Sequence, residues 1–478
     1  MRRSDFLAPL GYGGLGLIVV ILPIVLWKLD LPIISNTYGN DYELFELFGF
    51  CASIGLIVSA GIKLRKQRDV CFERILLTAL PVLVGFYFLN LIAEYSIKPW
   101  DYGCYESAAN AIITGANPYS TADYRYPPLV AQSIAVMYQL IQVGLVVVRA
   151  NMSSESIWGL IYYFYQCGQF FLIELAFLLC YRFARGVGLQ SIPALALVTA
   201  MFLFNTPLIR TLRHGQVNLW VLNSVLLATL LIDNYPIISG LAVALGGHIK
   251  LYPLVFCLPW AVTKRWRALL GAVVGLFAIV LIQTKGGQNW QLWHQFLAFF
   301  KSFPTGTRFR DNSLYSIAYN LLRLTGLLGQ HAADLQAVVR GVGAIATLAI
   351  LAWFFWRFIE REKVFSAADT AGDPNANNAG STFRLYGHLM DALALALLVP
   401  PVVWEHHYVL AMPIALWAIA TRWRDKSWQV GIGAFLIFVL PTFDVFPFSY
   451  HRVIGLLMLL HLTSPTAQRS LRTHQESV

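Results

Sequence analysis

The chain has 478 residues, of which 57% are hydrophobic and only 13% are charged. This composition, spread over many long apolar runs, excludes an independently folding soluble domain and predicts a polytopic, all-α integral membrane protein. The net charge of +10 arises from basic residues in short loops such as 63–68 and 264–267, as the positive-inside rule describes. We therefore expect the membrane, and no nucleic acid, as a partner.

The apolar runs predict the membrane spans in chain order. The candidates are 8–28, 45–62, 73–95, 128–148, 157–181, 191–209, 216–233, 235–249, 252–263, 267–284, 313–329, 335–357, 386–403, 405–421, 428–445 and 451–463. If the basic loops are cytoplasmic, parity makes 313–329 and one run between residues 127 and 181 non-spanning. We expect about 12–14 transmembrane helices. The first run resembles a secretory signal but lacks a small-residue cleavage site, and we interpret it as an uncleaved helix.

The same pattern divides the chain into five parts. They are two N-terminal transmembrane helices (1–70), a central transmembrane module (71–360), a flexible cytoplasmic linker (361–384), C-terminal transmembrane helices (385–464) and a cytoplasmic tail (465–478). The linker contains a polar run without apolar periodicity. Residues 287–303 have helical apolar spacing but are too polar to span, which predicts an amphipathic helix on the outer surface.

One acid lies just outside an apolar run. Asp101 follows the span that ends near residue 95, and a loop rich in Tyr, Asn and Pro comes after it. The acidic loop 29–46 is expected outside, so by parity Asp101 lies outside too. A carboxylate at this interface is placed to act on lipid-linked substrates. An ordinary interfacial acid or a helix cap would have the same position.

On this topology, five polar groupings that are far apart in sequence fall on the outer side. They are Asp101 with Tyr105 and Tyr126; Arg210, Arg213, Gln216 and Asn218; Lys250; Asn312; and Trp404, His406 and His407. Ionisable residues at membrane depth are costly and usually mark a functional pathway. The convergence therefore predicts a shared cavity at the outer face.

Each group also has a structural interpretation. Lys250 lies between two apolar runs too short for full spans, which favours a broken helical pair, but a lysine can also extend to the membrane surface. Gln216 and Asn218 can be hydrogen-bonding partners between helices. Arg210 and Arg213 can be interface anchors in place of phosphate ligands.

The residue types suit transfer from an anionic donor. A carboxylate can take the proton of an attacking hydroxyl, while Lys, Arg and His stabilise charge on a departing phosphate. Tyr105, Tyr126 and Trp404 suit sugar faces, although aromatic belts occur at all membrane interfaces. The adjacent His406 and His407 lack the spacing that puts two imidazoles on one helix face, so no metal is expected. No cofactor is indicated, and the six cysteines form no CxxC pair.

The order of short motifs resembles a known family. Asp-x-x-x-Tyr at 101, Gly-x-Asn-Pro-Tyr at 115, Gly-Gln-x-Asn at 215, Lys-x-x-Pro at 250 and Trp-Glu-His-His-Tyr at 404 are similar to glycosyltransferase family 87. The resemblance runs from about residue 75 to 420. The two N-terminal helices precede it, and Asn312 is followed directly by Ser313 where the family often has an intervening Gln.

The resemblance implies a GT-C-type helical bundle whose central module is catalytic. It also implies Asp101 as the catalytic base and Lys250 and His407 near the donor phosphate. The expected activity is an inverting, metal-independent transfer of a hexose, mannose in many members, from a polyprenyl-phosphate donor to a lipid or glycan acceptor. The expected location is the outer face of a bacterial cytoplasmic membrane.

Two other classes remain open from the residues. A transporter or flippase also needs buried charges, but it commonly shows internal repeats, and none is visible here. A ligase or polymerase of lipid-linked glycans would share the carrier lipid and the outer site. It would differ in using a diphosphate-linked oligosaccharide as donor.

Overall fold

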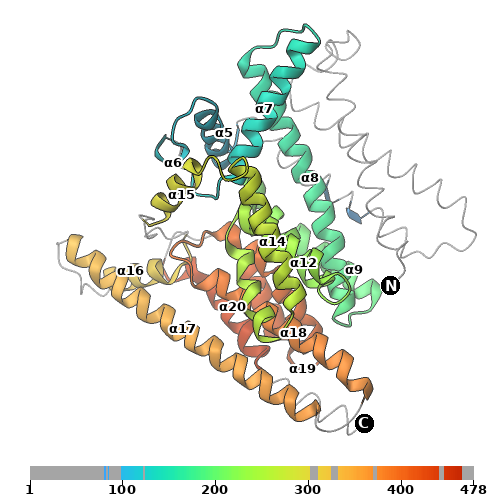
Figure 1. The fold of residues 1–478 in the computed structure, drawn as a ribbon. Helices are drawn as coiled ribbons and strands as arrows, with labels where there is room; N and C mark the ends of the chain where they lie inside the picture. Colours follow the sequence, from blue (N-terminus) through green and yellow to red (C-terminus); the bar gives the residue numbers. More distant parts are fainter. Residues whose placement is uncertain are drawn as a thin grey trace, which may run out of the picture.

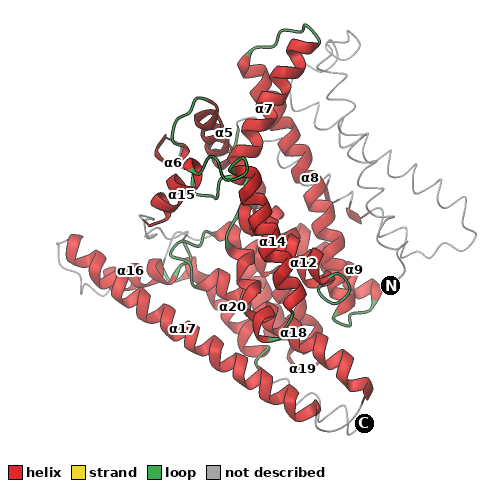
Figure 2. Ribbon diagram, viewed as in Figure 1, coloured by secondary structure: helices red, strands yellow, loops and turns green. Residues whose placement is uncertain are grey.

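Helices dominate the computed structural model, which describes residues 80–81, 84–85, 98–121, 124–301, 311–324, 332–369, 374–440 and 446–465 (Figures 1 and 2). Within these ranges the only β-type pairing is an isolated bridge between Asp311 and Trp404. The described part of the chain thus confirms the prediction of an all-α fold. The first two predicted spans, nearly all of the third and most of the tail lie outside the described residues.

The elements follow one another from α5 to α20. They are α5 (Trp100–Ile113), α6 (Pro118–Thr121), α7 (Leu129–Val147), α8 (Ser154–Gly186), α9 (Ser191–Leu203), α10 (Thr206–Arg213), α11 (Asn218–Leu231), α12 (Pro236–Ile249), η1 (Tyr252–Phe256), α13 (Cys257–Val262), α14 (Trp266–Gln283), α15 (Gln291–Lys301), α16 (Leu314–Leu324), α17 (Ala332–Asp369), α18 (Pro374–Leu398), η2 (Glu405–Ala411), α19 (Met412–Phe438), η3 (Phe448–Tyr450) and α20 (His451–Leu462).

Among the described residues, four helices are long and apolar enough to cross a membrane. They are α7, α8, α14 and the part Ala337–Val364 of α17, and α9 with α10 makes a fifth if this pair, bent by 50°, counts as one span. Several predicted spans are shorter than the roughly 20 residues that a full crossing needs. Helices α11 and α12, for example, have 14 residues each. The expected total of about 12–14 spans stays a prediction.

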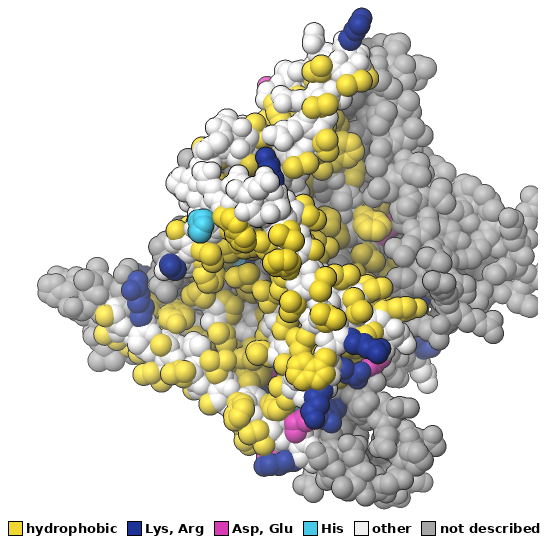
Figure 3. Space-filling model, in the orientation of Figure 1, with side chains coloured by type: hydrophobic (Ala, Val, Ile, Leu, Met, Phe, Trp, Pro, Cys, Tyr) yellow, Lys and Arg dark blue, Asp and Glu magenta, His cyan; other side chains and the backbone are white. Residues whose placement is uncertain are grey.

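The outer surface of the bundle is apolar where lipid is expected. Figure 3 shows hydrophobic side chains over the middle of one face, with Lys and Arg mostly around the border. On α14, Leu270, Val273, Val274 and Phe277 are each more than half exposed. Contiguous apolar surface of this kind on a long apolar helix fits contact with acyl chains.

Glycines allow α12 and α14 to pack with their backbones in close contact. A Cβ on Gly240 would lie 2.1 Å from the carbonyl oxygen of Ala268, and one on Gly271 would lie 2.3 Å from that of Ile237. Neither distance is possible for a larger residue without moving a helix. Small residues commonly permit such packing in membranes. The contact fixes α12, whose C-terminal end presents Lys250.

Short and broken helices position the polar residues. The run predicted as one span at 191–209 is divided at Asn205, whose side chain accepts a hydrogen bond from the amide of Leu208 at 2.9 Å and so caps α10. Pro207 in the first turn of α10 reinforces the break. The redirected α10 ends at Arg213, beside the loop that leads to Gln216.

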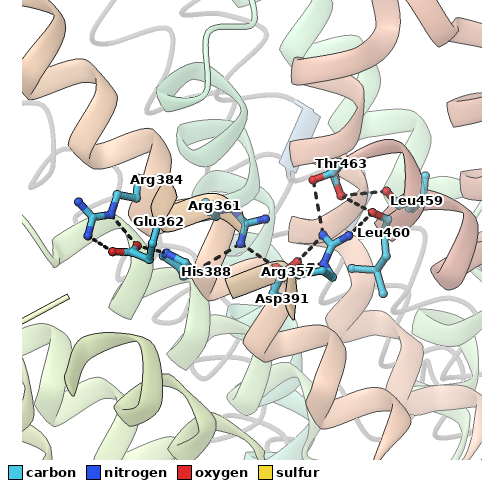
Figure 4. Close-up of polar contacts among 9 residues, drawn as sticks. All are labelled: Arg357, Arg361, Glu362, Arg384, His388, Asp391, Leu459, Leu460 and Thr463. Atoms are coloured by element: carbon cyan, nitrogen blue, oxygen red, sulfur yellow. Dashed lines mark hydrogen bonds and ion pairs between the residues drawn. The ribbon is translucent and has the colours of Figure 1, made fainter. Parts of the chain in front are cut away.

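A buried charge network ties α17, α18 and α20 together (Figure 4). The carboxylate of Asp391 accepts hydrogen bonds from Arg357 and Arg361, each at 2.7 Å. Arg357 also donates to the carbonyl oxygen of Leu460 at 2.7 Å. Arg384 pairs with Glu362 nearby. Because two guanidinium groups share one carboxylate in a buried position, the network fixes how these helices pack.

The flexible linker expected at 361–384 does not agree with the structure. Helix α17 continues to Asp369 and α18 begins at Pro374. Arg361 is almost fully buried in the charge network, and Glu362 pairs with Arg384. The linker prediction rests on polar composition, whereas the pairs of Arg361 with Asp391 and of Glu362 with Arg384 join helices at the two ends of this segment. The other domain boundaries remain predictions.

One smaller expectation is confirmed. The amphipathic helix predicted in 287–303 is α15, in which Phe296 is buried while Leu297 and Phe300 are about half exposed. Within the run 313–329, residues Leu314–Leu324 form α16. Residues 325–329 lie outside the described ranges, so the expectation that this run does not span the membrane stays a prediction.

Candidate active site

Asp101 lies in the first turn of α5, where the helix dipole favours a negative charge. Its side chain is 23% exposed, and its Oδ2 lies 4.0 Å from Nδ1 of His214. The acid is therefore partly open to a substrate and faces the loop after α10. His214 is thus a neighbour of Asp101 that was not among the residues predicted from sequence.

Gln216 links Asp101 to the tyrosines of the outer loop. Its Oε1 accepts hydrogen bonds from the hydroxyl of Tyr126 at 2.8 Å and of Tyr105 at 3.4 Å. Its side chain also hydrogen-bonds Asp101. The preceding Gly215 has a φ of +65°, and a Cβ there would lie 3.0 Å from Cβ of Tyr102. A glycine at this turn thus allows the loop to reach α5.

Lys250 is the cation at the centre of the site. Only 8% of the residue is exposed, and its Nζ donates to Oδ1 of Asn218 at 2.9 Å. The same Nζ lies 2.8 Å from Nε2 of His407. It also lies 5.4 Å from the ring centre of Tyr126 and 5.2 Å from that of Tyr252. The ammonium is thus held between an amide oxygen, an imidazole and two aromatic rings.

Tyr252 is a contact that sequence reasoning did not assign. Its hydroxyl lies 3.1 Å from Nδ1 of His407. When Lys250 is charged it can only donate, so Nε2 of His407 is the acceptor and the imidazole proton is on Nδ1, facing Tyr252. In the sequence, only its position two residues after Lys250 points to a role for this tyrosine.

The segment after Trp404 is held by buried polar contacts. The carbonyl oxygen of His406 accepts from Nδ2 of Asn218 at 3.1 Å and from the hydroxyl of Thr211 at 3.2 Å. Nε of Arg210 lies 3.2 Å from Oε1 of the buried Glu405. These contacts hold η2 against α10 and α11. Arg210 therefore has a protein carboxylate as its partner.

Asp311 joins the loop before α16 to the same segment. Its Oδ1 accepts hydrogen bonds from the amide of Val403 at 2.7 Å and from that of Ser313 at 3.0 Å. The amide of Asn312 donates to the carbonyl oxygen of Val403 at 2.6 Å. Because Asp311 forms an isolated β-bridge with Trp404, Asn312 and Trp404 lie close together. The contacts are those of a structural support for η2.

Burial changes the acidity of both carboxyl groups. It raises the pKa of Asp101, an effect opposed by the hydrogen bond from Gln216 and by electrostatic interactions with His214 and Lys250. Burial also raises the pKa of Asp311 to about 6, against the lowering effect of its backbone hydrogen bonds. A carboxylate with a raised pKa is a stronger proton acceptor.

The structure brings together most of the residues predicted from sequence. Asp101, Tyr105, Tyr126, Gln216, Asn218, Lys250, His406 and His407 form one contiguous cluster, with Arg210, Asn312 and Trp404 at its border. Arg213 is exposed on the last turn of α10. Within the described ranges, no group of three His, Cys, Asp or Glu side chains is arranged to hold a metal.

A helical membrane protein that gathers a carboxylate, a lysine and histidines among tyrosines has the features of a membrane glycosyltransferase. The chain belongs to glycosyltransferase family 87, whose sequence profile matches residues 126–372. This range contains Lys250 and Gln216. Asp101 lies before it and His407 after it.

Two curated relatives are mannosyltransferases. The chain is 30% identical over 239 residues to the polyprenol-phosphate-mannose-dependent alpha-(1-2)-phosphatidylinositol pentamannoside mannosyltransferase of Mycolicibacterium smegmatis, covering 49% of this chain and 50% of the relative. It is 25% identical over 240 residues to the corresponding phosphatidylinositol mannoside mannosyltransferase of Mycobacterium tuberculosis, covering 49% and 48%. The matches thus span about half the length of these relatives. No solved structure matches the chain.

Proposed function

We propose that the protein transfers a hexose, which we take to be mannose, from a polyprenyl-phosphate donor to a lipid or glycan acceptor. The proposal rests on a cluster of four residues in which each contacts the next. They are Asp101, Gln216, Tyr126 and Lys250. The cluster combines a partly open base with a buried cation. Both curated relatives are named as polyprenol-phosphate-mannose-dependent, which supports the donor.

In the proposed reaction Asp101 is the general base. An acceptor hydroxyl attacks the anomeric carbon of the donor sugar as Asp101 takes its proton. The bond between that carbon and the phosphate oxygen breaks, and polyprenyl phosphate leaves with the bonding electrons. A single displacement inverts the anomeric configuration.

Lys250 and His407 are proposed to bind the donor phosphate. The leaving group gains negative charge as the glycosidic bond breaks, and a desolvated ammonium stabilises that charge strongly. Asn218 orients the ammonium through the 2.9 Å hydrogen bond. The cation is thus held in position before the substrate arrives.

The remaining expectations belong to the same proposal. The active site faces the outside of a bacterial cytoplasmic membrane, and residues 71–360 form the catalytic module with the C-terminal helices of 385–464 completing the site. His406, Tyr105 and Trp404 line the substrate region, and Arg210 supports it through Glu405. Arg213, exposed at the end of α10, serves as an interface anchor in this arrangement.

The experiment is a transfer assay. Purified protein is incubated with radiolabelled polyprenyl-phosphate mannose and total membrane lipids, and the lipids are separated. The proposal predicts a labelled glycolipid other than the donor. Labelled product formed only from diphosphate-linked oligosaccharide donors would contradict it and favour a ligase.

A further inference from the structure

A cavity lies between α6 and α15, outside the cluster described above. Its volume is about 490 Å³, and Asn117, Tyr119, His294, Gln295, Ala298 and Phe299 line it. Figure 1 shows α6 and α15 side by side next to α5, and the two helices are in contact. The size suits one or two sugar rings.

The lining has the chemistry of a carbohydrate site. The rings of Tyr119 and Phe299 stack with centroids 5.7 Å apart and planes at 29°. Aromatic rings pack against the apolar faces of sugars, and the ring face turned away from this stack is the one that can do so here. Oε1 of Gln295 is shielded from solvent and has no hydrogen-bond partner among the described residues. An acceptor oxygen in this state suits a hydroxyl donor on a ligand.

A short chain of contacts joins the cavity to the proposed base. The hydroxyl of Tyr119 donates to the carbonyl oxygen of Tyr126 at 3.0 Å. The hydroxyl of Tyr126 donates to Gln216, which hydrogen-bonds Asp101. The cavity is therefore joined to Tyr126, whose ring faces Lys250 and whose hydroxyl leads to Asp101 through Gln216. An acceptor bound there would lie beside the proposed base.

Helix α15 also offers an apolar surface beside the cavity. Leu297 is 51% exposed and Phe300 is 52% exposed, while Phe296 is buried against Tyr119. An amphipathic helix of this kind lies at the membrane interface with its apolar face toward the acyl chains. A ligand with a sugar headgroup and a lipid tail fits both surfaces.

We propose that this cavity binds the sugar headgroup of a glycolipid acceptor, with its tail along α15. The inference rests on the proposed function, because it names the acceptor site of that reaction. It assigns Phe299 and Gln295 to acceptor binding. The donor phosphate remains assigned to Lys250.

The test measures binding and transfer separately. Dissociation constants of octyl α-mannoside and methyl α-mannoside are measured by calorimetry for the parent protein, Phe299→Ala and Leu297→Ala. We expect octyl α-mannoside to bind more tightly than methyl α-mannoside. Phe299→Ala should weaken both about fivefold or more, because it removes the stacking face. Leu297→Ala, on the same helix but outside the cavity, should leave methyl α-mannoside binding unchanged.

The outcomes distinguish the two proposals. No binding of octyl α-mannoside to the parent, or equal binding by Phe299→Ala, overturns the acceptor cavity. Equal binding of the two glycosides would leave a soluble glycan as the ligand and overturn the glycolipid assignment. In the transfer assay, Phe299→Ala should raise the KM for the acceptor without changing that for the donor, and a raised donor KM would also overturn the cavity. Binding without any transfer by the parent would instead refute the proposed reaction.

Discussion

Among the single residues of the site, Gln216 makes contacts that join several segments of the chain. Its side chain contacts Asp101 and accepts from two tyrosines, and its carbonyl oxygen accepts from Nε2 of Gln169 at 3.1 Å. All of these partners come from other segments of the chain. An amide can donate to a carboxylate and accept from hydroxyls at once, which no charged side chain can do.

The raised pKa of Asp101 predicts the pH dependence of transfer. A general base must be unprotonated, so the rate should fall as the pH decreases through the pKa of Asp101. Because burial raises this pKa above the ordinary value of 3.8, the fall should begin at a higher pH than for a solvated aspartate. The measurement is kcat/KM against pH. A flat profile down to about pH 4 would show that Asp101 is not the base.

Tyr252→Phe should reduce donor use without unfolding the protein. The change removes the hydroxyl that lies 3.1 Å from His407 and so releases the imidazole proton from its fixed position. We expect kcat/KM for the donor to fall by roughly tenfold, which corresponds to one lost hydrogen bond of about 1 kcal/mol or slightly more. Acceptor KM is the control and should not change. An unchanged donor kcat/KM would leave Tyr252 as a packing residue.

At the scale of elements, short helices and their breaks create the site. The sequence allowed α9 and α10 to be taken as one span, because apolar periodicity does not report where a helix bends. The break depends on the capping side chain of Asn205 and on Pro207. By contrast, the end of α12 at Lys250 was predictable, since a lysine followed by Pro253 interrupts two apolar runs.

The charge network around Asp391 makes a stability prediction at this scale. Asp391→Asn keeps the shape but leaves the guanidinium groups of Arg357 and Arg361 without a buried counter-charge. Breaking such a pair from one side costs about 3–5 kcal/mol. Thermal unfolding in detergent should therefore occur at a markedly lower temperature. Glu360→Gln, at the exposed pair with Lys363, is the matched control and should change little.

At the scale of the molecule, charged contacts lie at both ends of the bundle. Arg265 pairs with Asp233 at 2.9 Å, which brings two connecting loops to one end. Helices α11 and α12 adjoin Asp233, and their other ends carry Asn218 and Lys250, which belong to the site. This arrangement agrees with the alternation expected from the basic loops. The charge pattern of the loops predicts which end faces the cytoplasm.

Cysteine labelling tests that direction. In a chain whose native cysteines are replaced by Ser, a cysteine at Ser120, which is exposed near the site, should react with an impermeant thiol reagent in intact cells. A cysteine at Ser427, exposed beside the basic segment 422–426, should react only after permeabilisation. The reverse pattern would place the site on the cytoplasmic side.

Much of the site could be predicted from sequence because its residues are unusual for a membrane. Lys250, Asn218 and His407 are costly at membrane depth, so their presence alone marked them. Tyr252 and Gln295 could not be found in this way, since Tyr and Gln are common at interfaces and only their contacts distinguish them. The helical ends of the expected linker 361–384 could not be predicted from composition, because ion pairs between two helices, such as Glu362 with Arg384, leave no local sequence pattern.

The rate of sugar transfer by Asp101→Asn distinguishes the proposed reaction from other functions of this site. The amide keeps the size and polarity of the side chain but cannot take a proton, so transfer should fall about a hundredfold or more. Donor binding should persist, because Lys250 and His407 are unchanged. Asp311→Asn is the control: its amide oxygen can still accept from Val403 and Ser313, so transfer should be largely kept. Near-parental transfer by Asp101→Asn, with loss in Asp311→Asn, would contradict the assignment of the base.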